Sequence, residues 1–365
     1  MKNNRKKIAV GMSGGVDSSL TAALLKEEGF DVIGLTMAIW DGSVSVGSTG
    51  GHACYGPDEK EDIESAAAIC RQIDIPFYVI NLKDEFKNIV LKYFRKEYLA
   101  GRTPNPCIMC NRHLKFGFLI EKAKKSGIEF DLFATGHYAR IERKNNRFLL
   151  KRGAHLSKDQ TYFLYALTQE QLSRTMFPLS NYSKSQTREA ARSLGLKSAD
   201  SPESQDFIAG NDYSALFAPD EITGGEIVDE NGTPIGRHNG IINYTVGQRK
   251  GLGIAAPTPL YVTKIDAANN RIIAGRKDGL LSSRFIVSDI NWIAFENLDR
   301  HCKITVKIRL NHKEVGAKLI PDEGGRVKVV TDTPQTAVTN GQSAVFYSGD
   351  MVLGGGIIER VEIQI

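Results

Sequence analysis

Two short stretches of this 365-residue chain carry residues that could do chemistry. The first, residues 13–19, reads Ser-Gly-Gly-Val-Asp-Ser-Ser and follows the apolar run Ile8-Ala9-Val10. Adjacent glycines let a backbone approach a ligand closely, and the N–H groups of such a turn, with the helix start behind it, form a concave anion site. Ser13, Ser18 and Ser19 add hydroxyl donors. The stretch therefore predicts a phosphate-binding loop between a buried strand and a helix.

The second stretch contains two thiols, Cys107 and Cys110, in a Cys-x-x-Cys pattern before a helix expected over residues 112–125. A helix N-terminus and basic neighbours, here Arg112 and Lys115, lower the pKa of a thiol, so we expect a nucleophilic thiolate at Cys110. Half of a zinc site is one alternative, but no second Cys-x-x-Cys or His pair follows at ligand spacing. A simple dithiol that cycles to a disulfide is the stronger alternative.

The elements that must position these stretches alternate between strands and helices. Apolar runs at residues 8–10, 31–39, 76–81 and 131–135 are separated by helical patterns, which predicts a parallel sheet with right-handed crossovers. Ligands bind outside the carboxyl ends of such strands. We therefore expect the phosphate loop, the Thr36-Met37 end of the second strand, and Gly136-His137 to converge on one crevice.

The rest of the chain changes character. We expect a Gly/Ser-rich loop over residues 40–56, a hairpin arm over 147–152, helices beginning near Lys158 and over 183–194, and a Gly-rich, strand-like region from about Pro219. Residues 303–310 alternate polar and apolar side chains, as in a half-exposed strand, and similar runs suggest a small barrel or sandwich. The predicted domains are residues 1–205, 206–282 and 283–365.

Composition sets broad limits. The chain is 41% hydrophobic and 24% charged, which is ordinary for a soluble globular protein. It has no run of 18 apolar residues, and its basic start lacks the apolar core of a signal peptide, so we expect a cytoplasmic protein without a membrane span. A net charge of +5 is compatible with a polyanionic partner. Five cysteines, an odd number, argue against a disulfide framework.

Residues 13–19 match neither the Walker A motif nor the dinucleotide fingerprint. They resemble the pyrophosphate loop of ATP pyrophosphatases, enzymes that split ATP between the α- and β-phosphates and adenylate a carbonyl-type oxygen. With this loop occur, in order, Gly-Arg-Thr-Pro-Asn-Pro-x-x-x-Cys-Asn, Ala-Thr-Gly-His-Tyr, Lys-Asp-Gln-Thr-Tyr-Phe-Leu and Gly-Gln-Arg-Lys-Gly-Leu-Gly. Together these motifs resemble the tRNA 2-thiouridylase family over essentially the whole chain.

The resemblance implies an α/β fold: a parallel-sheet ATP pyrophosphatase (adenine nucleotide alpha hydrolase-like) domain, a small central tRNA-contacting domain and a C-terminal β-barrel. It implies that ATP, with Mg²⁺ shielding its phosphates, adenylates the C2 oxygen of the wobble uridine of tRNA, with the base flipped out of its stack. Sulfur from a persulfide donor or relay protein is then carried by Cys110, which attacks C2 and expels AMP.

The resemblance also implies further site residues. Those matching nucleotide-binding positions are Gly11, Met12, Ser13, Gly14, Gly15, Val16, Asp17, Ser18, Met37 and Gly136. Those matching tRNA-binding positions are His137, Lys158, Asp159, Gln160, Arg309, Leu310 and Gln342. Asp17 suits a metal-linked role or simple helix capping equally well. Arg102, Arg112 and Lys115 are expected to contact phosphates.

One departure from the family is important. The family has a second cysteine in a Ser-Gln-Asp/Glu-x-Cys-Phe segment, but residues 201–213 here contain no cysteine. Three explanations stay open. In the first, Cys107 is the resolving thiol. In the second, an iron–sulfur cluster delivers sulfur, with Cys54 as a candidate third ligand. In the third, the chain is a paralogue that thiolates poorly or differently. Cys54, Cys70 and Cys302 are expected to be structural, and Cys54 is the one of these to test as a third ligand.

Two other functions are weighed against this one. A pyrophosphatase-loop enzyme that ligates or amidates a small molecule would not need the β-rich appendix. A non-enzymatic RNA-binding module would not need an intact phosphate loop.

Overall fold

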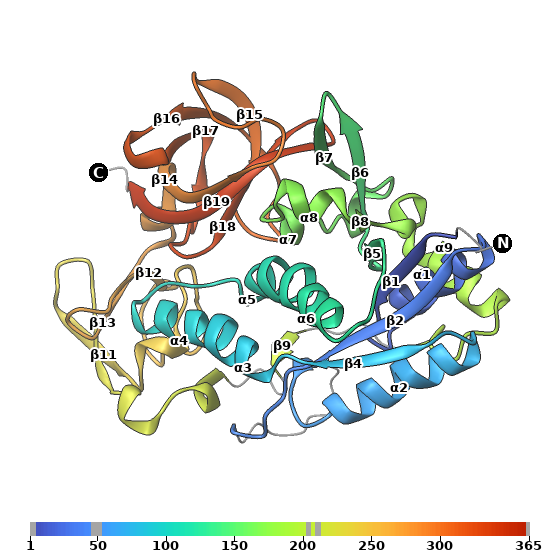
Figure 1. The fold of residues 1–365 in the computed structure, drawn as a ribbon. Coiled ribbons are helices and arrows are strands. Elements are labelled where there is room, and N and C mark those ends of the chain that lie inside the picture. Colours follow the sequence, from blue (N-terminus) through green and yellow to red (C-terminus); the bar gives the residue numbers. More distant parts are fainter. Residues whose placement is uncertain (1–4, 45–52, 202–205, 209–212, 363–365) are drawn as a thin grey trace. The chain divides into compact units, whose positions relative to one another are not determined.

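The computed structural model describes residues 5–44, 53–201, 206–208 and 213–362 (Figure 1). The chain divides into two compact units. The first comprises residues 1–90, 107–212 and 350–352, and the second residues 91–106, 213–349 and 353–365. In the described part of the chain, every helix is too short or too polar to cross a membrane.

The first unit is organised around a parallel sheet, as predicted from the alternating pattern. Its strand order is β4-β2-β1-β5-β8, and neighbouring strands pair in parallel. The bounds are Lys7–Gly11 for β1, Asp31–Ala38 for β2, Phe77–Asn81 for β4, Leu132–Ala134 for β5 and Thr175–Met176 for β8. Because β1 is central, Ile8, Ala9 and Val10 are fully buried, which is why the run contains no polar residue.

Helices connect these strands. They are α1 Val16–Glu27, α2 Glu59–Gln72, α3 Lys83–Glu85, α6 Leu119–Lys125, α7 Thr161–Leu164, α8 Gln169–Ser173 and α9 Lys184–Ser193, with π-helical turns at Phe86–Leu91 and Cys110–Phe118. The helix expected to begin near Arg112 instead begins at Pro106, as α5 Pro106–Met109. Proline suits the first position of a helix because the N–H it lacks would have no intrahelical partner there. Both Cys107 and Cys110 therefore lie within helical turns.

Two smaller elements complete the first unit. Strands β6 Ala139–Lys144 and β7 Arg147–Arg152 form the expected hairpin. The prediction of an uninterrupted loop over residues 40–56 is wrong at its end, because Ala53–Tyr55 forms strand β3 and pairs in parallel with β9 Asp206–Ile208. A loop cannot show this pairing in its own sequence, since the partner strand lies about 150 residues away. Residues 45–52 of the predicted loop, and most of the cysteine-less segment 201–213, lie outside the described residues.

The second unit is β-rich and contains α4 Lys92–Leu99. One sheet has the order β11-β10-β13-β12, with bounds Pro234–His238, Gly225–Val228, Arg271–Gly275 and Tyr261–Asp266. The other runs β14-β17-β16-β15-β18-β19 and closes into a barrel through β14–β19 pairing. Its strands are β14 Leu281–Trp292, β15 Cys302–Lys307, β16 Val315–Pro321, β17 Val327–Thr336, β18 Ser343–Ser348 and β19 Met351–Glu362.

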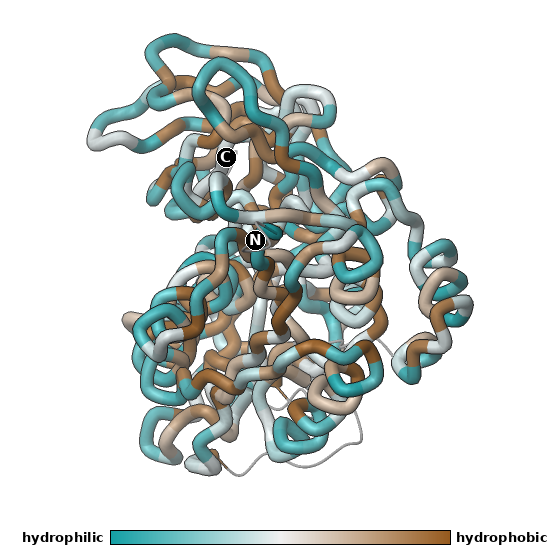
Figure 2. The backbone as a smooth tube through the Cα atoms, turned by 45° about the vertical axis from the view of Figure 1, so that its right-hand side comes forward, coloured by the Kyte–Doolittle hydropathy of each residue, from teal (hydrophilic) through white to brown (hydrophobic). Residues whose placement is uncertain are grey.

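The C-terminal barrel confirms the predicted fold class and the predicted alternation. Ile304 and Val306 of β15 are buried, whereas Lys303, Thr305 and Lys307, which alternate with them, are exposed or half-buried. In Figure 2 short hydrophilic and hydrophobic stretches alternate along the chain. Side chains alternate across a strand, so one face fills the barrel and the other meets water.

Candidate active site

The phosphate loop lies between the carboxyl end of β1 and the start of α1, as predicted. Gly14 has a φ of +79°, and a Cβ there would lie 3.1 Å from the Asp62 carbonyl oxygen. Glycine is therefore required at this position by both conformation and space. Gly15 is the N-cap of α1, and the N–H groups of the first turn have no intrahelical partner. These groups provide the anion-binding edge that the motif predicts.

The serine hydroxyls make hydrogen bonds within the loop. Ser18 and Ser19 are buried, and both hydroxyls donate to the Gly15 carbonyl oxygen, at 3.1 and 2.8 Å. The Ser18 hydroxyl also accepts from the Ser13 backbone N–H at 3.2 Å. These hydroxyls bind the loop to itself, and donation by Ser18 or Ser19 to a ligand stays a prediction. Ser13, which is exposed, keeps its hydroxyl 3.2 Å from that of Ser18.

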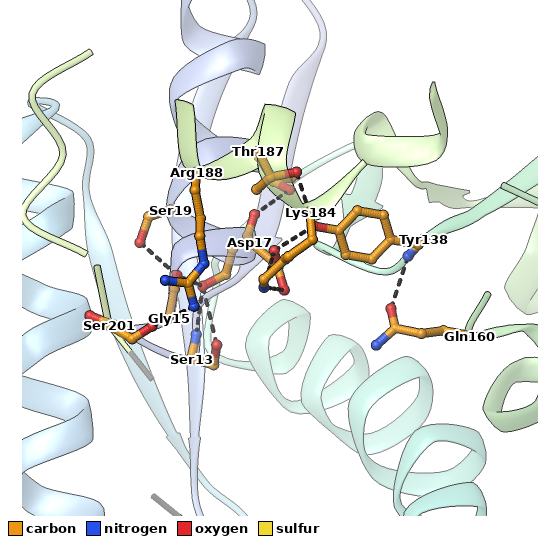
Figure 3. A network of polar contacts seen from close by, with 12 residues as sticks. Ser13, Gly15, Asp17, Ser19, Tyr138, Gln160, Lys184, Thr187, Arg188 and Ser201 are labelled. Carbon is orange, nitrogen blue, oxygen red and sulfur yellow. Dashed lines mark hydrogen bonds and ion pairs between the residues drawn. The ribbon is translucent and has the colours of Figure 1, made fainter. Parts of the chain in front are cut away.

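Asp17 lies in the first turn of α1, but the capping role considered for it is wrong, since Gly15 occupies the cap. Its carboxylate instead accepts from Lys184 Nζ at 2.9 and 2.8 Å and from the Tyr138 hydroxyl at 2.7 Å (Figure 3). The Tyr138 hydroxyl also hydrogen-bonds with that of Thr187 at 2.9 Å. Asp17 is thus held by two elements, α9 and the segment after β5.

Gly136 lies directly against Asp17. A Cβ on Gly136 would meet the Asp17 carbonyl carbon, Cβ and oxygen at 2.7, 2.8 and 2.9 Å. This close approach brings the end of β5 to the phosphate loop, as expected from the topology. Met37 lies near the end of β2, two residues beyond Leu35, the partner of Gly11. Met12 is 3% exposed and packs in the core with Ile8 and Val10, so only its backbone can face a ligand.

His137 follows Gly136, is half-buried and lies near two aromatic rings. Its ring centroid lies 6.0 Å from those of Phe116 and Phe177, and its Nδ1 is 2.7 Å from the Thr135 hydroxyl. Burial, reinforced by the positive charge of Lys115, holds the pKa of His137 well below its usual value. The imidazole is therefore neutral at physiological pH and can take part in hydrogen bonding and stacking, but not in ion pairing.

Cys110 begins a π-helical turn, and its thiol is not the activated thiolate that was expected. Burial raises the pKa of the Cys110 thiol to about 11, although Lys115 lowers it in part. Cys54 adds to the rise, so the two thiols lie within electrostatic range of each other. The expectation failed because desolvation of the thiolate outweighs the nearby positive charge. By solvent exposure Cys54 is exposed, and Cys107 and Cys110 are both partly buried.

The other two cysteines agree with the structural role expected for them. Cys70 is fully buried, and burial raises the pKa of its thiol to about 12. Burial also raises the pKa of Cys302. Among the residues that the structure describes, no group of three or more His, Cys, Asp or Glu side chains is arranged to hold a metal ion. The described part of the chain therefore does not by itself provide the four ligands that iron–sulfur clusters usually have.

Residues of the first unit that are predicted to contact tRNA also make hydrogen bonds and ion pairs within this unit. The Asp159 carboxylate accepts from the Thr161 hydroxyl at 2.7 Å and lies 3.7 Å from Arg152. Gln160 accepts from the Tyr138 N–H at 2.9 Å through its side chain. Lys158 ends a 3-10 turn and is partly buried. These contacts fix the segment beside Tyr138, and the role of Lys158 toward RNA stays a prediction.

In the second unit, the predicted tRNA-contacting side chains also bind backbone. Arg309 donates to the carbonyl oxygens of Thr336 and Ala337 at 3.0 and 2.6 Å, and Leu310 follows it. Gln342 donates to the Thr103 carbonyl oxygen at 2.9 Å, and Arg102 pairs with Glu97 at 2.6 Å. Gln342 thus positions the Gly-Arg-Thr-Pro segment.

Sequence reasoning missed Lys184. The helix over residues 183–194 was predicted, and its Ser183 capping box with Gln186 is present. A lysine in the first turn of an amphipathic helix, however, looks like any solvated charge. Its partner Asp17 is 167 residues away, so only the fold reveals the pair.

Comparison with known protein families divides the chain into three parts. Residues 6–209 match the tRNA methyl transferase HUP domain, residues 219–276 the tRNA methyl transferase PRC-barrel domain, and residues 282–358 the aminomethyltransferase beta-barrel domain. A solved 4-thiouridine synthetase–RNA complex with bound ATP aligns at 17% identity and a TM-score of 0.37, over 56% of this chain and 46% of that chain. That similarity is too low to bear on function.

Curated relatives match over nearly the whole chain. The tRNA-specific 2-thiouridylase MnmA of Clostridium botulinum is 44% identical over 99% of this chain and 100% of its own length. The MnmA of Acetivibrio thermocellus is 47% identical over 98% of this chain and 100% of its own length. The MnmA of Endomicrobium trichonymphae is 48% identical over 96% of this chain and 98% of its own length.

Proposed function

Because the chain belongs to the tRNA-specific 2-thiouridylase MnmA family, we propose that it replaces the C2 oxygen of the wobble uridine in tRNA with sulfur, at the expense of ATP. The observation that carries the proposal is the joint presence, in one compact unit, of the phosphate loop after β1 and the Cys110 thiol. A small-molecule ligase would use the loop but would not need the thiol. An RNA-binding module would need neither.

The first proposed step is adenylation of the C2 oxygen. Residues 11–18, with Met37 and Gly136, bind ATP, and the backbone N–H groups at the start of α1 hold the pyrophosphate as it leaves. Asp17 is the protein carboxylate suited to Mg²⁺, since that ion is commonly held by one or two carboxylates together with substrate phosphates. Mg²⁺ bound there would neutralise phosphate charge. Lys158, Asp159, Gln160, His137, Arg309, Leu310 and Gln342 serve tRNA binding, directly or by positioning the segments that do so.

The second proposed step is sulfur transfer. The Cys110 thiolate attacks the outer sulfur of a donor-protein persulfide, and the donor leaves as a thiol. The outer sulfur of the resulting Cys110 persulfide attacks C2, and the C2–O bond breaks with loss of AMP. A second thiolate then attacks Cys110 Sγ, which leaves the sulfur on C2 and forms a protein disulfide. A thiol reductant restores the dithiol. Cys107 is our proposed second thiol, and Cys54, which acts electrostatically on Cys110, is its competitor. We place these reactions in the cytoplasm, where such reductants act.

The test is a reconstituted reaction with unmodified tRNA, ATP and a persulfide donor, in which mass spectrometry measures 2-thiouridine. ATP–pyrophosphate exchange is followed in parallel. We expect tRNA-stimulated exchange and formation of 2-thiouridine. Exchange stimulated by a small metabolite would point to a ligase. Exchange that tRNA stimulates without formation of 2-thiouridine would indicate a paralogue that thiolates poorly. Absence of ATP turnover would indicate an RNA-binding module.

A further inference from the structure

Helix α9 directs two cationic side chains, Lys184 and Arg188, toward the phosphate loop. They are four residues apart and therefore share a helix face. Lys184 Nζ lies 2.8 and 2.9 Å from the carboxylate oxygens of Asp17. Arg188 donates to the Ser201 carbonyl oxygen at 3.4 Å. In Figure 3 both side chains extend from α9 toward the loop.

The Lys184–Asp17 ion pair is not needed to attach α9 to the unit. The helix already packs through Ala191, which is fully buried in a cluster with Val16 and Leu20 of α1. The side chains of Lys184 and Asp17 are 14% and 30% exposed. Removing charges from water is costly, so a largely buried ion pair is weak evidence for a role in stability. The pair therefore calls for another explanation.

The charges of the phosphate loop explain why the ion pair is present. Residues 11–19 contain no lysine or arginine, and their one charged side chain is the Asp17 carboxylate. A carboxylate beside an incoming polyphosphate repels it. Lys184 removes this repulsion, and its ammonium already stands at the loop. A lysine can exchange one anionic partner for another, because its ammonium is a compact charge with three N–H donors at the end of a flexible side chain.

We propose that Lys184 is a pyrophosphate-binding residue, whose ammonium transfers from the Asp17 carboxylate to the phosphate oxygens when ATP binds. Tyr138 is a positioning residue in this exchange. Its hydroxyl stays on Asp17 at 2.7 Å and is braced by Thr187 at 2.9 Å, so the carboxylate keeps its place when the lysine leaves. The inference rests on the proposed use of ATP, but it concerns pyrophosphate binding and not sulfur transfer.

The experiment measures binding of inorganic pyrophosphate and of adenosine by calorimetry, with EDTA present. We expect Lys184→Met to weaken pyrophosphate binding at least tenfold, with adenosine binding unchanged and partial recovery in Lys184→Arg. The matched control is Arg192→Met, on the same helix. Arg192 pairs with the exposed Asp200 at 2.6 Å, and its loss should leave both affinities unchanged.

A second variant keeps the proposal falsifiable if Lys184→Met does not fold. Asp17→Asn removes the repelling charge and the ion pair with Lys184, so pyrophosphate should bind several-fold more tightly in EDTA. Unchanged or weaker binding by Asp17→Asn, normal binding by folded Lys184→Met, or no binding by the wild type would each overturn the inference. Lys184-dependent pyrophosphate binding in a wild-type protein that forms no 2-thiouridine would support it, while refuting the proposed sulfur transfer.

Discussion

The phosphate loop and the thiol-bearing turn lie in the same unit but are prepared for their tasks to different degrees. In the loop, the hydroxyls of Ser18 and Ser19 and the close approach of Gly136 fix the backbone before any ligand arrives. At the thiol, burial raises the pKa of Cys110 to about 11, away from the reactive form. A site that binds a stable anion gains from being rigid, whereas a reactive thiol is protected from oxidation while it stays protonated.

The largest expected effect is a loss of thiolation without a loss of ATP–pyrophosphate exchange. Cys110→Ser should reduce 2-thiouridine formation to background, because the hydroxyl cannot carry persulfide sulfur, while the phosphate loop is untouched. Mass spectrometry of the tRNA and ATP–pyrophosphate exchange measure the two halves independently. Loss of tRNA-stimulated exchange in Cys110→Ser would show that the regions are not independent.

The next effect identifies the second thiol. With a persulfide donor, Cys107→Ser should stop 2-thiouridine release and leave tRNA attached to Cys110 through a disulfide, since no neighbouring thiolate would resolve it. Denaturing gels with and without reductant detect this adduct. Cys54→Ser is the matched comparison. If Cys107→Ser is fully active and Cys54→Ser accumulates the adduct, the resolving thiol is Cys54.

A structural change should test how rigid the loop is. Gly136→Ala places a methyl group 2.7–2.9 Å from Asp17 atoms, and overpacking of this kind costs about 1–3 kcal/mol. We expect a corresponding loss in the free energy of unfolding in urea, together with weaker ATP binding. Gly15→Ala is the comparison for packing only, since its Cβ would have 3.6 Å to the nearest atom, Ser13 Oγ; ATP binding is not compared, because Gly15 belongs to the phosphate loop. Equal stability of the two variants would mean that the loop yields easily.

The smallest effect concerns the acidity of Cys110. With a pKa of about 11, roughly one thiol in a thousand is ionised at pH 8, and the fraction rises about tenfold per pH unit. Alkylation of Cys110 by iodoacetamide, followed by peptide mass spectrometry, should rise with the same slope up to about pH 10. Lys115→Met should slow it several-fold, because Lys115 lowers this pKa. A plateau below pH 9 would contradict the raised pKa of this thiol.

Local sequence was sufficient wherever the physics is local. The apolar run of β1, the glycines of residues 14 and 15, and the alternation in β15 each follow from periodicity or backbone conformation over a few residues, and all three were predicted. The parallel sheet and the C-terminal barrel followed from the order of these patterns and from the family resemblance. The Cys-x-x-Cys pair was equally visible, but the helix begins at Pro106 and includes both thiols, which was not predicted.

Tertiary structure decided which groups meet and how much water reaches them. Whether Asp17 caps α1 or faces Lys184 depends on a helix 167 residues away. The pKa of Cys110 depends on burial, which outweighs the positive charge of Lys115. The proximity of Cys54 depends on where β3 and β9 pair. Contacts of this range arise from packing of the whole unit, so no pattern within a short stretch encodes them.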